Sequence, residues 1–388
     1  MQAITSSSQK GKALNIGIIG GGPAGLYFAL LMKKHNLAHQ VRVMEQNPYG
    51  ATYGWGVVFS DRALSFLRDS DLETYEDVMA QCRTWDDLTI VHKGEHVWID
   101  GSSYSGIGRL TLLRILQEHC RRCKVQMQFE TRLSDTSTFA DCDLIVGADG
   151  VNSVVRQQFA DHFQPSTRRL TNKYIWYGTH QLFDTLSLIF RTYHGGAFVA
   201  HCYPYSDTTS TFIVECDTET WQDAGFEHMS DSESRAYCEQ VFEDDLGGYP
   251  LLSNKSIWMN FKVVTNQMWN HRNVALLGDA LRTVHFSIGS GTRMALEDAI
   301  ALYHACITTD DITAALQAFE QARRPGMEKV LDIAEQSYTW YETFHEKMNL
   351  EPLQLVYSYM TRSGRITDED LHRRAPRFMA SYKAYMKP

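Results

Sequence analysis

The sequence contains no uninterrupted apolar run of the ~20 residues that a membrane-spanning helix requires. The apolar stretch after Lys12 is broken by four glycines between residues 20 and 25. No small-residue cleavage site follows this stretch before the basic residues at 33–35, so the pattern is not that of a signal peptide. A strand, a turn and a helix fit the stretch better, and we expect no membrane partner.

Positive charge is also scarce, because 37 Lys and Arg residues face 46 Asp and Glu residues and leave a formal net charge of −9. Nucleic acids and anionic membranes bind basic surfaces, so neither is an expected partner. The eight cysteines lack the regular spacing of a secreted disulfide framework. We expect reduced thiols in a cytoplasmic protein and no metal site; a zinc or redox role for Cys120 and Cys123 is the less favoured interpretation.

A glycine-rich turn lies between a buried-strand pattern at residues 14–19 and a buried-helix pattern at 26–32. In this context Gly20 permits a tight turn, Gly22 lets the backbone approach a pyrophosphate, and Gly25 lets the helix pack closely on the strand. The phosphates then lie at the positive end of the helix. The predicted nucleotide-binding turn consists of Gly20, Gly21, Gly22, Pro23, Ala24 and Gly25.

A second strand pattern covers residues 40–44 and leads directly to Glu45. An acidic side chain at this place accepts hydrogen bonds from an adenosine ribose. Turn-forming residues among aromatics then fill residues 47–60, which predicts a mobile loop near the ligand and no core strand. A helix is expected to begin at Arg109, whose side chain either reaches the pyrophosphate or is solvated.

The second glycine signature follows a buried-strand pattern at residues 143–148, which delivers Asp149 and Gly150 to the carboxyl edge of a parallel sheet. Open α/β sheets bind their ligands at that edge. A helix is expected to open just after it, at residues 152–156.

The third signature repeats this design, with Gly278 and Asp279 after another strand pattern. The Asp279 carboxylate suits the ribityl hydroxyls of a flavin. Gly289 and Gly291 flank a turn into a helix at residues 294–300, whose first N–H groups can stabilise negative charge on a reduced flavin ring. Together the three signatures, in this order, predict bound FAD.

These signatures resemble the class A FAD-dependent aromatic monooxygenases, the para-hydroxybenzoate hydroxylase-type family, over residues 14 to about 330. Residues 53–61, 285–292 and 357–363 are similar to the monooxygenase part of salicylyl-CoA 5-hydroxylase and of 2-aminobenzoyl-CoA monooxygenase. Residues 172–179 and 211–216 look equally like the violacein-pathway hydroxylases. The chain departs from the broad family's His, Pro and Asn at three positions, namely Arg282, Phe286 and Arg293.

Between the second and third signatures, apolar and polar residues alternate in short strand patterns that predict an antiparallel meander. By the resemblance, this sheet is the family's substrate domain. The expected fold is α/β: a Rossmann-type FAD-binding domain with an inserted antiparallel β-sheet substrate domain and C-terminal helices. The expected parts are a disordered tail (1–13), a discontinuous FAD-binding domain (14–170 and 266–330), the substrate domain (171–265) and a C-terminal helical region (331–388).

The resemblance implies an enzyme that uses FAD, NADH or NADPH, and O2 to hydroxylate an aromatic small molecule through a flavin C4a-hydroperoxide. The first expected substrate is an aryl thioester on CoA or on an acyl carrier protein, and the alternative is an indolic or fused-ring intermediate. A flavin halogenase is disfavoured because the Trp-x-Trp-x-Ile-Pro segment is absent. A non-catalytic escort protein has no need of the second and third signatures. Monomer and homodimer both remain open.

Three side chains are candidates for handling a proton near the ring, because His and Tyr both donate and accept: His201, Tyr203 and His285. Each is also compatible with a purely structural role. The expected substrate wall comprises Trp55, Tyr177 and Phe286. The basic residues of the C-terminal region either meet a CoA phosphate tail or form a solvated face; they are Arg362, Arg365, Arg373 and Arg374.

Overall fold

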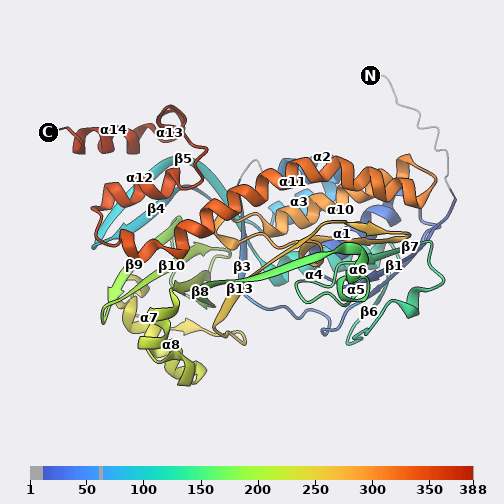
Figure 1. Ribbon diagram of the computed structural model, residues 1–388, viewed down its shortest axis with the longest axis horizontal. Coiled ribbons are helices and arrows are strands. Elements are labelled where there is room, and N and C mark those ends of the chain that lie inside the picture. Colours follow the sequence, from blue (N-terminus) through green and yellow to red (C-terminus); the bar gives the residue numbers. More distant parts are fainter. Residues whose placement is uncertain (1–11, 61–63, 388) are drawn as a thin grey trace.

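The computed structural model describes residues 12–60 and 64–387, so the predicted tail at residues 1–13 lies almost wholly outside the described residues. Two β-sheets organise the chain, one of six strands and one of nine. The six-stranded sheet lies toward one end of the molecule and the nine-stranded sheet toward the other, and the long helix α11 (Ile312–Glu342) runs along both (Figure 1). Within the described ranges no helix combines the length and the apolar content needed to cross a bilayer.

The six-stranded sheet has the order β14-β15-β7-β1-β2-β6, and all its pairs are parallel except β14 with β15. The three strands that precede the glycine signatures, β15, β7 and β1, are therefore neighbours, and their carboxyl ends meet at one edge. This confirms the Rossmann-type arrangement expected from the sequence. The strands are β1 (Asn15–Ile19), β2 (Gln40–Met44), β6 (Gln126–Gln128), β7 (Leu144–Gly147), β14 (Asn270–His271) and β15 (Val274–Leu276).

Helix α1 (Pro23–His35) follows the first glycine turn and is buried along nearly its whole length. It packs against α4 (Arg109–Arg122) on one side and α10 (Gly291–Thr308) on the other. Pro23 occupies the first turn of the helix, where its missing N–H costs nothing, and basic side chains in the last turn complement the helix dipole. Leu26, Phe28 and Leu30 are each 0% exposed, and burying each side chain stabilises the fold by roughly 1.5–3 kcal/mol.

The nine-stranded sheet takes strands from a wider part of the chain than the predicted substrate domain. Strand β4 pairs in parallel with β9, joining Leu88 to Leu186, and β5 and β3 extend the sheet beyond β4. A local pattern identifies a strand but not its partner, so the sequence alone predicts that these N-terminal strands belong to the FAD-binding domain. The strands are β3 (Gly56–Ser60), β4 (Arg83–His92), β5 (Glu95–Gly108), β8 (Pro165–Thr179), β9 (Leu186–Tyr193), β10 (Gly196–Pro204), β11 (Ser210–Cys216), β12 (Leu251–Leu252) and β13 (Met259–Asn266).

The expectation of a loop through residue 60 is wrong for residues 56–60, which form the edge strand β3. Its partner is β5, and Phe59 is only 1% exposed. Glycines and aromatics dominate this segment, so its composition resembles a loop. Pairing with β5 and burial of Phe59 override that local preference.

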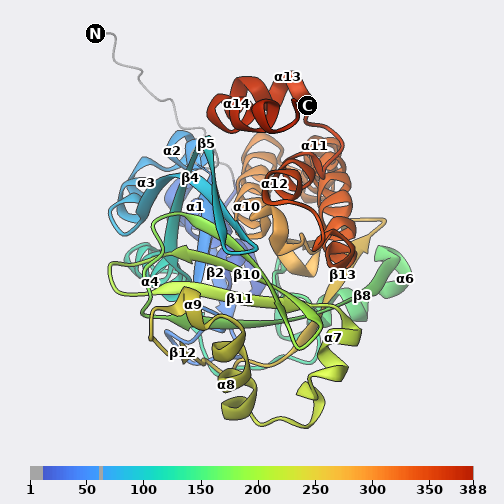
Figure 2. The ribbon, with the colours of Figure 1, turned by 90° about the vertical axis from the view of Figure 1, so that its left-hand side faces the viewer.

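The nine-stranded sheet has helices on both of its faces (Figure 2), and successive residues of a strand face these two layers. On β10, Val199 joins a core with α11 and α12 (Pro352–Thr361). Phe198 and Ala200 join a core with α8 (Asp231–Val241) and α9 (Glu243–Leu246). This period-2 alternation decides which side chains can reach the site described below. The remaining helices are α2 (Ser65–Ser70), α3 (Leu72–Met79), α5 (Val154–Gln158), α6 (Ala160–Phe163), α7 (Thr218–Asp223), α8 (Asp231–Val241), α9 (Glu243–Leu246), α12 (Pro352–Thr361), α13 (Asp368–Arg374) and α14 (Pro376–Tyr385).

Candidate active site

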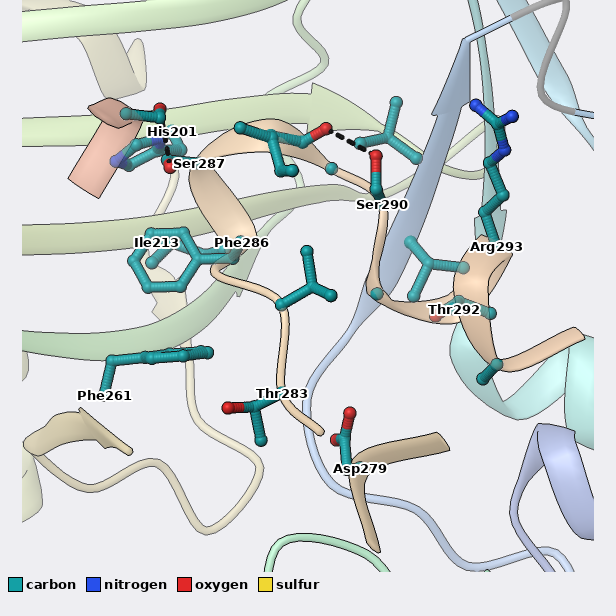
Figure 3. Close-up of a pocket in the computed structure, with 18 of the residues that line it drawn as sticks. His201, Ile213, Phe261, Asp279, Thr283, Phe286, Ser287, Ser290, Thr292 and Arg293 are labelled. Carbon is teal, nitrogen blue, oxygen red and sulfur yellow. Dashed lines mark hydrogen bonds between the residues drawn. The ribbon is translucent and has the colours of Figure 1, made fainter. Parts of the chain in front are cut away.

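A cavity of about 940 Å³ is lined by the nine-stranded sheet, by the segments that follow β1, β7 and β15 of the six-stranded sheet, and by α11 and α12. All three glycine signatures reach it, through Gly22, Gly150 and Gly278. The opposite wall is aromatic and comes from the nine-stranded sheet and the loop before α10 (Figure 3). The volume lies at the upper end of the roughly 300–1,000 Å³ range of small-molecule sites. The two kinds of lining divide the cavity into a nucleotide-type end and an aromatic end.

The first glycine turn leaves room for a ligand in front of α1. Gly20 has a φ of +107°, and a Cβ there would lie 2.2 Å from the Ala148 carbonyl oxygen, so the turn itself requires glycine. Gly22 has an ordinary extended backbone, and a Cβ there would meet no atom within 4 Å. No side chain caps the helix at Gly22. The free N–H groups and the open space fit a pyrophosphate, as FAD binding requires.

Glu45 stands at the end of β2 and is joined to the same turn. Its Oε2 accepts a hydrogen bond from the Gly21 N–H at 2.7 Å, and its Oε1 accepts from the Asn47 N–H at 2.7 Å. The carboxylate therefore fixes the glycine turn against β2. Glu45 lies outside the lining of the cavity described above, and its contact with a ribose stays a prediction.

Arg109 and Asp279 bring opposite charges to the cavity from α4 and from the third signature. The Nε of Arg109 is buried without a hydrogen-bond partner in the described part of the chain. Asp279 lies deep in the protein, yet its side chain is exposed because it opens onto the cavity. Burial raises the pKa of Asp279, and the nearby Arg109 and Arg282 oppose this shift. Unpaired groups of this kind fit a ligand that carries both donors and acceptors.

The second signature supplies backbone to the cavity, and its aspartate supports that backbone. Gly150 has a φ of +79° and open space where a Cβ would lie. Asp149 Oδ2 accepts a hydrogen bond from the Val154 N–H at 2.6 Å, and burial raises the pKa of this carboxyl group. Its Oδ1 is buried without a partner among the described residues.

The residues that depart from the family pattern in the third signature have separate roles. Arg282 is 3% exposed and faces α10, where its Nη1 lies 2.6 Å from Asp298 Oδ2. Asp298 also pairs with Arg323 of α11, so Arg282 ties the loop to two helices. Arg293 lines the cavity and donates from its Nε to Glu297 Oε1 at 2.7 Å. Phe286, one of the residues expected in the substrate wall, lines the cavity, and its contact with a substrate stays a prediction.

His201 of β10 lines the aromatic end and is paired with a buried carboxylate. Its Nε2 lies 3.2 Å from Glu215 Oε2 on β11, and Glu215 is 2% exposed. Asn172 Nδ2 donates to the other Glu215 oxygen at 2.8 Å and so orients the carboxylate. The imidazole ring packs at 5.3 Å from the Phe286 ring. Sequence alone indicated His201 but not Glu215, because their contact depends on the pairing of β10 with β11.

Tyr203 lines the cavity two residues further along β10, on the same face as His201. Its hydroxyl donates to the Gly56 carbonyl oxygen at 2.9 Å, and burial raises its pKa. The phenolic proton is therefore committed to the protein backbone. This arrangement suits a structural role better than the proton handling expected from the sequence.

His285 lies behind the wall of the large cavity and borders a smaller one of about 160 Å³. Burial lowers its pKa to about 3, and nearby His201 adds to this shift, so the imidazole is neutral in the folded protein. Its Nδ1 is 2.9 Å from Ser287 Oγ. The sequence shows that His285 directly precedes the predicted flavin loop but does not reveal that its side chain borders the smaller cavity.

Trp55 and Tyr177, two expected substrate residues, lie outside the lining of the large cavity. Trp55 packs on Gly178, and the Tyr177 hydroxyl faces Ser234 of α8 at 3.3 Å. Tyr177 points to the side of β8 that packs on α8 and α9. Its neighbour Trp176 points to the other side and faces the cavity. Both faces of the strand carry aromatic residues, so the pattern of aromatics alone does not show which face borders the cavity. The aromatic wall comprises Tyr174, Trp176, Phe261 and Phe286.

Comparison with known proteins shows the family to which this chain belongs. The family model described as FAD binding domain matches residues 13–334. The chain is 38% identical to salicyloyl-CoA 5-hydroxylase of a Streptomyces species, over 90% of this chain and 70% of that protein. It is 38% identical to protodeoxyviolaceinate monooxygenase of Chromobacterium violaceum, over 90% and 94%. It is 34% identical to 3-hydroxy-4-methyl-anthranilyl-[aryl-carrier protein] 5-monooxygenase of Streptosporangium sibiricum, over 92% and 97%.

Among solved structures, 2-methyl-3-hydroxypyridine-5-carboxylic acid oxygenase matches with a TM-score of 0.70 at 17% identity. The match covers 94% of this chain and 99% of that one. At this identity the likeness concerns the fold, which is that of a flavin monooxygenase.

Proposed function

This chain belongs to the FAD binding domain family of flavin-dependent monooxygenases, and we propose that it hydroxylates an electron-rich aromatic ring held as an aryl thioester. The thioester is carried by CoA or by an acyl carrier protein. The observation that supports this best is the two-part cavity, with glycine signatures at one end and aromatic side chains at the other. Two of the relatives reported above are named for a CoA-linked and a carrier-linked aryl substrate.

We propose that the nucleotide-type end holds FAD. The turn at Gly22 and the N-terminus of α1 face its pyrophosphate, Arg109 adds positive charge there, and Asp279 accepts from its hydroxyls. The Glu45 carboxylate would accept hydrogen bonds from the adenosine ribose, and the backbone at Gly289 and Gly291 would contact the ring system. When bound, FAD supplies the redox chemistry by which NADH or NADPH and O2 deliver one oxygen atom to the substrate.

His201 is the proposed proton acceptor for a ring hydroxyl or amino group. The Nε2–H donates to Glu215, which leaves the lone pair on Nδ1 available to the substrate. Accepting this proton at Nδ1 raises the electron density of the ring when it is attacked by an electrophilic oxygen. The Glu215 carboxylate then stabilises the imidazolium. A positioned general base of this kind contributes roughly 10²–10⁴-fold to rate.

The aromatic wall orients the ring and keeps water away from it. Tyr174, Trp176 and Phe286 present flat apolar surfaces to the cavity, and the Tyr174 and Phe286 ring centroids are 4.9 Å apart. Burial raises the pKa of Tyr174 to about 12, so the hydroxyl remains neutral and adds no charge beside the substrate. Excluding water protects a reactive oxygen donor until the ring is in place.

The alternative substrate is an indolic or fused-ring intermediate. One relative is named for protodeoxyviolaceinate, and the match covers 94% of that protein. An aromatic wall of four rings accommodates a fused ring as well as a single one. The eight free cysteines fit a reducing compartment, which supports a cytoplasmic location for either enzyme.

The experiment that separates these substrates uses the FAD-loaded protein and a panel of free aromatic acids, their CoA thioesters and indoles. Stimulated NAD(P)H oxidation together with a product that has gained one oxygen atom supports the proposal. A protein that cannot be loaded with FAD, or whose NAD(P)H oxidation ignores every aromatic compound, would contradict it. A response to indoles alone selects the alternative.

A further inference from the structure

Four side chains from three separate elements form one chain of hydrogen bonds beside the aromatic end. Arg362, directly after α12, donates from Nε to Ser337 Oγ of α11 at 2.9 Å. Ser337 Oγ lies 2.9 Å from Ser287 Oγ in the loop before α10, and Ser287 Oγ lies 2.9 Å from His285 Nδ1. The chain therefore links the C-terminal region to the loop that carries the third glycine signature.

The hydrogen bonds between these four side chains all run in one direction, from Arg362 to His285. The Ser287 N–H also donates to His285 Nδ1 at 3.3 Å, and burial keeps this imidazole neutral, so Nδ1 is an acceptor. Ser287 then donates to His285, Ser337 donates to Ser287, and Arg362 donates to Ser337. A chain with one consistent direction fixes the guanidinium in place, because no member has to choose between two partners.

The guanidinium of Arg362 is held by three hydrogen bonds and by one contact with an aromatic ring. Its Nη1 donates to the Tyr359 carbonyl oxygen at 2.8 Å, and its Nη2 donates to the Ser287 carbonyl oxygen at 3.2 Å. Its Cζ lies 3.8 Å from the centroid of the Tyr359 ring. These contacts and the bond to Ser337 use three N–H donors, and a guanidinium has five, so two remain.

In the part of the chain that the structure describes, the positive charge of Arg362 has no counter-ion. In residues 12–60 and 64–387 no carboxylate oxygen lies within the 4.0 Å ion-pair distance of this guanidinium. Arg362 is half-buried and lines the cavity. The Arg362 guanidinium is a fixed cation with two unused N–H donors at the edge of an aromatic cavity. Such a group is suited to bind an oxygen acceptor of a ligand.

We propose that Arg362 binds the carbonyl oxygen of the substrate's acyl group and so selects aroyl compounds over other aromatics. This inference rests on the proposed aromatic hydroxylation. The acceptor is either an aryl carboxylate or an aryl thioester carbonyl, which present the same oxygen to the two free N–H groups. Arg362 is therefore a specificity-determining residue for the class of ring that enters.

The position of Arg362 relative to His201 gives the ring two fixed points. Arg362 bonds to Ser287, and the preceding residue, Phe286, packs against the His201 ring at 5.3 Å. Both side chains thus approach the aromatic end through the same short loop segment. With the acyl oxygen on Arg362 and a ring hydroxyl or amino group on His201, the ring has one orientation in the cavity.

The test measures equilibrium binding of three probes to the FAD-loaded protein by calorimetry. The probes are salicylate, the N-acetylcysteamine thioester of salicylate, and phenol, which lacks an acyl group. The variants are Arg362→Met, Arg362→Lys, which keeps the charge but loses the planar fork, and the control Arg365→Met. Arg365 is exposed and pairs with Asp332, away from the cavity lining. The flavin spectrum and the urea midpoint of each variant report whether it is folded.

The proposal expects the wild type to bind at least one acyl probe more tightly than phenol. Arg362→Met should weaken that binding about ten- to a hundredfold and leave phenol within about twofold. Arg362→Lys should be intermediate, and Arg365→Met should match the wild type. If the Arg362 variants bind only salicylate more weakly, the group that Arg362 binds is a carboxylate. If they bind the thioester more weakly, that group is a thioester carbonyl.

A preference for acyl probes that survives in both Arg362 variants overturns the proposal. So does a wild type that binds phenol as tightly as the acyl probes. In that second case, phenol-stimulated NAD(P)H oxidation would leave the hydroxylase function standing. If the wild type binds no aromatic probe and oxidises NAD(P)H at one rate with all of them, both proposals fail.

Discussion

His201 Nε2 lies 3.2 Å from Glu215 Oε2, and this buried pair faces the aromatic end of the cavity. The two residues stand on neighbouring antiparallel strands, so the rigid sheet sets their separation. The pair resembles the arrangement by which a carboxylate holds a neutral imidazole in one tautomer, with its second nitrogen free to accept a proton.

We expect His201→Gln to lower the turnover of a hydroxylated or aminated ring by about 10²-fold, because the substrate proton loses its acceptor. Glu215→Gln should act in the same direction and less strongly. The steady-state rate at which hydroxylated product forms measures the effect of both variants. The control is Tyr203→Phe, whose hydroxyl donates to the Gly56 carbonyl and whose loss should change turnover by less than about tenfold. Equal effects at His201 and Tyr203 would contradict this assignment.

We expect Gly22→Val to fold normally and to bind FAD about ten- to a hundredfold more weakly. The backbone at Gly22 suits any residue, and the space beyond it is empty in the protein, so a new side chain collides only with the ligand. Visible absorbance after loading with FAD measures binding, and urea unfolding measures the fold.

The matched control for Gly22→Val is Gly326→Ala on the exposed side of α11, where a Cβ also meets nothing within 4 Å. This change should leave FAD binding unaltered and stabilise the helix by up to about 1 kcal/mol. Full FAD loading of Gly22→Val would show that the turn does not hold the pyrophosphate.

His285 predicts a pH dependence of stability. Its pKa falls from an unperturbed 6.5 to about 3 on folding, so between these values the unfolded chain binds more protons than the native state. The contribution of His285 is therefore fully present above pH 6.5 and is lost as the pH falls toward 3. The expected loss is about 1.4 kcal/mol per pH unit in that window.

Urea unfolding of the wild type and of His285→Asn at pH 7, 6 and 5 tests this dependence. The difference between the two proteins removes the opposing contributions of buried carboxyl groups such as Asp149 and Asp279, whose pKa values are raised by burial. The free-energy difference between the proteins should shrink as the pH falls. A difference that is constant over this range would mean that folding does not lower the pKa of His285.

Trp176 and Tyr177 are neighbours on β8 that face opposite sides of the sheet. Trp176→Ala should weaken binding of an aromatic probe by about tenfold or more, because it removes a ring from the cavity wall. Tyr177→Phe removes only a hydroxyl that faces Ser234 and should leave probe binding within about twofold. Calorimetry with the FAD-loaded proteins measures both constants. The reverse order of effects would contradict the strand parity.

The features that were predictable from the sequence are local. A strand, a glycine turn and a helix follow one another within about twenty residues, so the pattern at Gly20–Gly25 carries its own structural meaning. The same holds for β7 and β15, and the parallel order of these strands then brings the three signatures together. Arg109 was also expected at a helix start, and α4 begins there.

The features that sequence could not supply depend on distant contacts. Tyr177 and Trp176 are both aromatic, so only the pairing of β8 with β11 reveals which one faces the cavity. Glu215 becomes the partner of His201 through the pairing of β10 with β11. Arg362 was one of several C-terminal arginines, and only the packing of α12 against α11 brings it to the cavity. Arg365 and Arg373 instead pair with Asp332 and Asp370, which lie outside the cavity lining.

The most direct test of the central claim combines cofactor, oxygen and substrate in one reaction. The FAD-loaded protein is given NADH or NADPH, isotopically labelled O2 and the N-acetylcysteamine thioester of salicylate or of 2-aminobenzoate. The account predicts that an aryl thioester accelerates NAD(P)H oxidation and gains one labelled oxygen atom on its ring. A product without label, or NAD(P)H oxidation that is the same with and without each thioester, would contradict it.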